Sequence, residues 1–99
     1  MAKYQLSNKA LLDLENIWDY TIVKWSENQA ESYFKQIIRT CSELSECPQI
    51  GKPYSEIRKD LFGFKTGKHI IFYENMNEQR IFVLRILHEQ MDFKGRLTA

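Results

Sequence analysis

Two long apolar runs stand in the second half of the chain, at 68–74 and 79–88, with a short polar turn at 75–78 between them. Both runs are rich in β-branched and aromatic residues, which favour strands. Neither run alternates apolar with polar residues, as a strand with one solvated face would. We therefore predict two antiparallel strands that lie inside a sheet and are covered on both of its faces.

Apolar residues recur at helical spacing over about 8–24 and again from 26 to 47. Ser7 precedes the first stretch and Ser26 opens the second, and both have side chains suited to helix N-caps. Pro48 ends the second stretch, because proline disfavours the helical region for the residue before it. Since only a tight corner separates the two helices, we expect them to pack as an antiparallel hairpin.

Three weaker patterns complete the predicted element order. Residues 3–6 could form an edge strand, and 57–65 could form another strand with a bulge at Gly63. After the last strand, 89–93 could make one helical turn, and Gly95 discourages a longer helix. The order β-α-α-β-β-β predicts an α+β fold, in which a helical hairpin packs on one face of a small, mostly antiparallel sheet. With 99 residues the chain is expected to form one domain, residues 1–99.

The net charge of +1 gives no reason to expect direct binding to nucleic acid, although the basic residues are unevenly placed. Residues 1–50 hold five Lys and Arg against seven Asp and Glu, whereas 51–99 hold nine against six. This bias fits either a solvated face or a surface for an anionic partner. Cys41 and Cys47 would stand about 9 Å apart on a continuous helix, too far for a disulfide.

No cysteine and histidine spacing typical of a metal site occurs, and we expect neither a metal nor another cofactor. The chain also has no apolar leader at its start and no apolar run of membrane-spanning length. We therefore expect a cytoplasmic protein that does not bind membranes. Trp18 and Trp25 lie on the apolar stripe of the first helix and are expected in the core.

An ordered set of short fragments resembles the ParE toxin family. The fragments run from Tyr4-x-Leu6-Ser7 through Gln29-Ala30, Pro48-x-x-Gly51, Arg58-x-x-Leu61 and Gly67-x-His69-x-Ile71-Phe72-Tyr73 to Arg85-Ile86-Leu87-His88-x-x-Met91-Asp92. The resemblance covers nearly the whole chain. It implies the ParE/RelE toxin fold and the toxin half of a type II toxin–antitoxin pair, with a ParD-like antitoxin as partner. It further implies inhibition of DNA gyrase and a role in plasmid stabilisation.

RelE relatives of this family instead cut mRNA on the ribosome, which makes endonuclease activity the alternative. Such a reaction needs a base, an acid and cations near the phosphate. The candidates for these roles are Arg85, His88, Tyr73 and Lys65. Arg85 and His88 stand three apart on one strand, which sends their side chains to opposite faces. Gyrase inhibition needs a binding surface and no catalytic residue, so we favour it.

The best candidates for contact with an anionic partner are Arg58, Lys59, Lys65, Lys68 and Arg85. Arg85 has a structural alternative, because an arginine within an apolar strand could pair with Asp13 or Asp92. The chain also departs from the family pattern, since it has Phe62 where ParE sequences often have arginine. This difference opens a third possibility, an inactive binding remnant.

Overall fold

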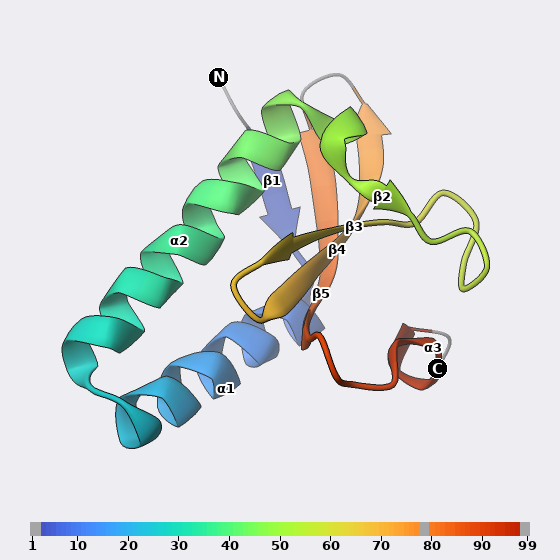
Figure 1. Cartoon of the computed structure of the whole chain (residues 1–99). Coiled ribbons are helices and arrows are strands. Elements are labelled where there is room, and N and C mark those ends of the chain that lie inside the picture. Colours follow the sequence, from blue (N-terminus) through green and yellow to red (C-terminus); the bar gives the residue numbers. More distant parts are fainter. Residues whose placement is uncertain (1–2, 78–79, 98–99) are drawn as a thin grey trace.

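A five-stranded sheet, with a helical hairpin across one face, organises the chain (Figure 1). The computed structural model describes residues 3–77 and 80–97. The elements are β1 (Lys3–Leu6), α1 (Asn8–Lys24), α2 (Glu27–Glu46), the 3₁₀ turn η1 (Pro48–Ile50), β2 (Lys52–Pro53), β3 (Phe62–Thr66), β4 (His69–Asn77), β5 (Arg80–His88) and α3 (Phe93–Leu97). The strand order is β1-β5-β4-β3-β2, and only the β1–β5 pairing is parallel among the described strands.

Both β4 and β5 lie inside the sheet, as their unbroken apolar sequences predicted. On the helix side, Ile71 and Val83 join the main core with Ala10, Ile37 and Leu44 from the helices. On the opposite side, a second cluster contains Leu61, Ile70, Phe72, Leu87 and Leu97. Both faces of the hairpin are therefore covered, which explains why neither strand alternates with polar residues.

A register shift in β5 adds to the irregular pattern. Phe72 pairs with Arg85 and Tyr73 with Val83, so Leu84 is the extra residue of a β-bulge. The Leu84 carbonyl accepts a hydrogen bond from Ser7 Oγ at 2.6 Å. Ser7 Oγ in turn accepts from Ala10 N at 2.9 Å, so one side chain caps α1 and attaches it to the bulge.

The segment before β3 differs from its prediction. The predicted strand at 57–65 is instead a set of turns over 55–60 followed by β3 at Phe62–Thr66. Asp60 has φ of 62°, a left-handed conformation that reverses the chain into β3. Gly63 is not bulged, because it pairs in register with Phe72 and with Lys52 of the short strand β2.

The ends of the central hairpin and of the chain also differ in detail. β4 continues to Asn77, so the prediction of a turn that begins at Asn75 is wrong. Position 78 of the predicted turn and position 79 of the predicted second strand lie outside the described residues. The last helical turn is at Phe93–Leu97, four residues later than expected, with Gly95 inside it. Asp92 Oδ1 accepts a hydrogen bond from Gly95 N, which caps this short helix despite the glycine.

Candidate functional site

Tyr73, a candidate for nuclease chemistry, is completely buried in the main core. Its hydroxyl donates a 2.6 Å hydrogen bond to the Pro48 carbonyl, and its ring stacks on Phe62 at 5.9 Å between centroids. Burial raises the pKa of the Tyr73 phenol. Phe62 is the position at which the chain departs from the family pattern. Its ring packs against the buried Tyr73, where an arginine would have to turn its charge away from the core, so the aromatic residue has a structural role.

Arg85, the second nuclease candidate, forms a bidentate ion pair with Asp13 on α1. Arg85 Nε and Nη2 donate to the two carboxylate oxygens at 2.8 and 3.0 Å. The side chains are only 16% and 11% exposed. The hydrogen bond to Asp13 raises the pKa of Arg85, and Ile86 N donates to the same carboxylate at 3.0 Å. Of the two carboxylates considered from sequence, Asp13 is therefore the partner.

The predicted cationic surface divides between the two ends of β3. Lys65 and Lys68 lie at the turn that leads into β4, where Lys65 pairs with Glu89 at 3.0 Å. Arg58 and Lys59 lie in the loop before β3, where Arg58 pairs with Glu74 at 3.4 Å (Figure 1). A five-residue strand spans roughly 13 Å between its end residues, so these cations form two groups.

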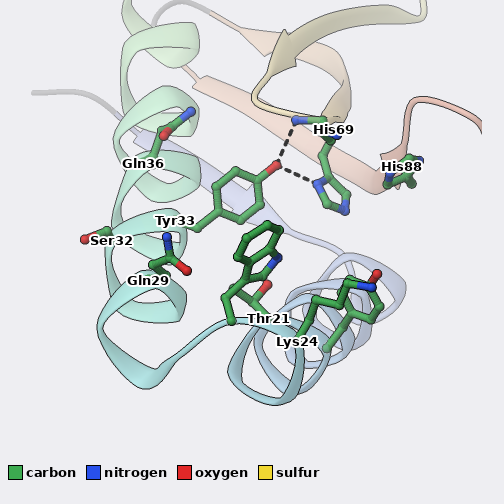
Figure 2. A pocket seen from close by; sticks show the side chains of 11 residues that line it. Thr21, Lys24, Gln29, Ser32, Tyr33, Gln36, His69 and His88 are labelled. Carbon is green, nitrogen blue, oxygen red and sulfur yellow. Dashed lines mark hydrogen bonds between the residues drawn. The ribbon is translucent and has the colours of Figure 1, made fainter.

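A pocket of about 530 Å³ opens where the end of the helical hairpin meets the β3–β4 turn (Figure 2). Its volume lies in the range of about 300–1,000 Å³ usual for small-molecule sites. It is lined by Tyr20, Thr21, Lys24 and Trp25 from the end of α1, by Gln29, Ser32, Tyr33 and Gln36 from α2, and by Lys68, His69 and His88 from the sheet. The lining contains two lysines, Lys24 and Lys68, and no carboxylate side chain.

Tyr33 joins the helical hairpin to the sheet at the floor of this pocket (Figure 2). Its hydroxyl oxygen accepts a hydrogen bond from Lys68 N at 3.1 Å and lies 2.6 Å from His69 Nδ1 and 3.3 Å from the Thr66 carbonyl. Gly67 has φ of 60°, and a Cβ there would meet the Tyr33 ring at 2.5 Å. Glycine thus serves both the turn and the close approach of the ring.

His69 packs edge-on against His88, with 5.3 Å between ring centroids and 82° between planes. Burial, followed by repulsion from His88, lowers the pKa of His69 from 6.5 to about 4, against opposing contributions from Asp13 and Glu89. His69 is therefore neutral at pH 7. Gln90 N donates to His88 Nδ1 at 3.2 Å, which leaves the other ring nitrogen of His88 for further contacts.

Sequence patterns identified His88 and Lys68 as candidate functional residues but did not predict that they line one pocket. Trp25, predicted in the core, is 65% exposed and lines the pocket instead. Helical spacing predicted Trp25 on the apolar stripe of the first helix. Trp25 is instead the C-cap of α1, where the chain leaves the helix, so the spacing no longer gives the direction of its side chain. Within residues 3–77 and 80–97, no group of three histidine, cysteine or acidic side chains could hold a metal ion. Cys41 and Cys47 are free, and no described helix could cross a membrane.

The architecture is that of the ParE/RelE toxins. The chain is similar to a solved structure of the chromosomal ParDE TA system from P. aeruginosa, with a TM-score of 0.73, 18% identity, and coverage of 89% of this chain and 96% of that one. It is also similar to the toxin–antitoxin complex RelBE2 from Mycobacterium tuberculosis, with a TM-score of 0.55, 18% identity, and coverage of 88% and 96%. The predicted α+β toxin fold is confirmed.

The chain belongs to the family described as ParE toxin of type II toxin-antitoxin system, parDE, whose model matches residues 4–93. Toxin ParE1 of Mycobacterium tuberculosis is 36% identical over 97% of this chain and 98% of that protein. Toxin ParE1 of Caulobacter vibrioides is 31% identical over 98% and 99%. Toxin ParE of Escherichia coli is 29% identical over 99% and 95%. The family resemblance is confirmed.

Proposed function

We propose that this ParE toxin inhibits DNA gyrase in the cytoplasm by binding it, and that no residue of the toxin acts as a catalyst. The observation that carries this proposal is the separation of Tyr73 and Arg85 from Lys65 and His88. Tyr73 donates to the Pro48 carbonyl in the core, and Arg85 pairs with Asp13 on α1. Lys65 and His88 instead both interact with Glu89, just after β5. A metal-independent nuclease needs its acid, base and cations around one phosphate.

The exposed cations favour a function in which the toxin binds its partner and does not cleave it. Arg58, Lys59, Lys65 and Lys68 are exposed cations, and we assign them to partner contacts. Arg85 also belonged to the predicted set. Its guanidinium is held by Asp13, so a partner would reach it only by displacing that carboxylate.

A ParD-like antitoxin is the second partner that we propose. Two of the structural neighbours come from ParDE and RelBE systems, and the second of these is a toxin–antitoxin complex. An acidic antitoxin segment would meet the cations at one or both ends of β3. If Arg58, Lys59 and Lys65 form this contact, their joint replacement by Glu should abolish copurification of a coexpressed antitoxin. Retained copurification would remove these residues from the interface.

The decisive experiment is a supercoiling assay with purified gyrase, relaxed plasmid and ATP, into which the toxin is titrated. Dose-dependent loss of supercoiling, with linear DNA trapped as a cleavage complex, supports the proposal. Tyr73→Phe serves as the matched variant, because it removes the phenol needed for a nuclease and keeps the ring in place. Unchanged supercoiling at a large excess of folded toxin would reject gyrase as the target, and codon-phased cuts in mRNA after induction would favour the RelE-like alternative.

A further inference from the structure

We infer that the pocket between the helical hairpin and the β3–β4 turn binds a nucleoside monophosphate, with its base stacked on the α1 aromatics and its phosphate held by Lys24 and Lys68. This inference goes beyond gyrase inhibition and does not depend on it. Three observations carry it: the charge of the lining, the exposure of its aromatic rings, and the polar groups left for a base.

The charge of the lining favours an anion. Lys24 comes from the last turn of α1 and Lys68 from the β3–β4 turn, so they approach the pocket from two elements. Neither lysine forms an ion pair within the described ranges 3–77 and 80–97. Two carboxylates act on the lining from outside it: Asp13, which is paired with Arg85, and Glu89, which interacts with Lys68 and His88 and is paired with Lys65. A phosphate monoester carries a charge of about −1.5 to −2 at pH 7, which two lysines match.

The aromatic rings favour a planar group. Tyr20 and Trp25 line the pocket and are 63% and 65% exposed, although both are large side chains that proteins usually bury at least partly. Stacking of a nucleic acid base on an aromatic side chain strengthens binding by roughly 5- to 150-fold. A base between the end of α1 and the floor at Tyr33 would cover the apolar part of the pocket that phosphate alone would leave open.

Polar side chains remain for the edge of the base. The Gln36 amide nitrogen donates to Thr66 Oγ1 at 2.9 Å, which leaves its amide oxygen as an acceptor. Gln29 presents a further amide from the first turn of α2 (Figure 2). At the floor, hydrogen bonds to the backbone of the β3–β4 turn hold the Tyr33 hydroxyl in place. Binding would therefore require little rearrangement, which favours affinity.

The test is titration of the purified toxin with AMP and CMP, followed by calorimetry and by the amide NMR signals of the β3–β4 turn. We expect saturable binding with a Kd of about 10 μM to 1 mM. Adenosine and inorganic phosphate, each used alone, should bind at least about tenfold more weakly. An oligonucleotide whose affinity rises with length would overturn the inference in favour of a polynucleotide track. Absence of saturation by either nucleotide up to about 5 mM would also overturn it.

Variants place the ligand in the pocket. Lys24→Ala and Lys68→Ala should each weaken AMP binding about tenfold but leave adenosine unchanged, whereas Trp25→Ala should weaken both by about tenfold. The matched control is Lys35→Ala, which removes a lysine paired with Glu31 on the outer side of α2. All four positions are exposed, so folding is expected to persist and is verified by circular dichroism. Equal losses in Lys35→Ala and Lys68→Ala would contradict the assigned site.

Discussion

The carboxylate of Asp13 holds the guanidinium of Arg85 through two hydrogen bonds, at 2.8 and 3.0 Å, across 72 residues of sequence. The same carboxylate accepts from Ile86 N, just after the bulge of β5. Three donors thus meet on one acidic side chain at the junction of α1 with the sheet. The arrangement fixes α1 on β5 and provides a counterion for Arg85, which is less exposed than Arg80, the other arginine in the described part of β5.

Replacing Asp13 by Asn should destabilise the toxin. The change removes the charge and leaves the mostly buried Arg85 guanidinium without its counterion, at an expected cost of about 3 kcal/mol in the free energy of unfolding. Urea denaturation measures the loss. The matched control is Glu74→Gln, which breaks the exposed pair with Arg58 and should cost less than about 0.5 kcal/mol. Similar losses in both variants would mean that burial does not distinguish the two pairs.

A methyl group at Gly51 should be poorly tolerated. A Cβ there would overlap the hydroxyl and ring of Tyr73, which is fully buried and cannot move away. We expect Gly51→Ala to cost about 1–3 kcal/mol through overpacking and loss of the Tyr73 to Pro48 hydrogen bond. Gly95→Ala is the control, because its Cβ would meet only the end of the Asp92 side chain. A thermal melt in which both alanines behave alike would refute this distinction.

Tyr73→Phe should separate stability from activity. Loss of the 2.6 Å hydrogen bond to the Pro48 carbonyl should lower the free energy of unfolding by about 1 kcal/mol. Inhibition of gyrase, measured on folded protein, should be unchanged because the buried phenol cannot touch a partner. A large loss of activity in this folded variant would show that the hydroxyl has a functional role and would revive the nuclease alternative.

Acid should weaken the toxin through His69. Because its pKa falls from 6.5 to about 4 on folding, the unfolded chain binds more protons between these values, and stability is lost as pH falls through this window. After allowance for solvent screening, the expected loss is on the order of 2 kcal/mol. His69→Asn should flatten the pH dependence of urea unfolding. Since the chain has two histidines, NMR can titrate both rings directly, and a His69 midpoint near 6.5 would contradict this account.

Local signals predicted much of the fold. The bounds of α1 and β1 follow from caps and spacing that involve near neighbours, such as Ser7 with Ala10. The turns at 55–60 were mistaken for a strand because Ile57 and Leu61 are apolar. These two side chains pack in the second apolar cluster, on the side of the sheet away from the helices. Periodicity detects helices and strands, so it cannot identify turn residues that pack in a core.

The sites depended on contacts distant in sequence. Asp13 could be anticipated as one of two partners for Arg85, since an arginine within an apolar strand requires a carboxylate. The pocket could not be anticipated, because its floor needs Tyr33 and His69, which are 36 residues apart, to meet at 2.6 Å. No spacing along the chain encodes that meeting, which the left-handed conformation of Gly67 permits.

The parallel pairing of β1 with β5 has a consequence for the order of events during synthesis. Lys3 lies beside Arg80, so β1 gains this neighbour only after a strand 77 residues further along the chain has been made. Contacts of such high sequence separation form late and slow folding. A nascent chain that has reached only β4 has its helices but lacks the strand on which Ser7 and Asp13 anchor α1. The attachment of α1 to the sheet therefore forms only after β5 has been synthesised.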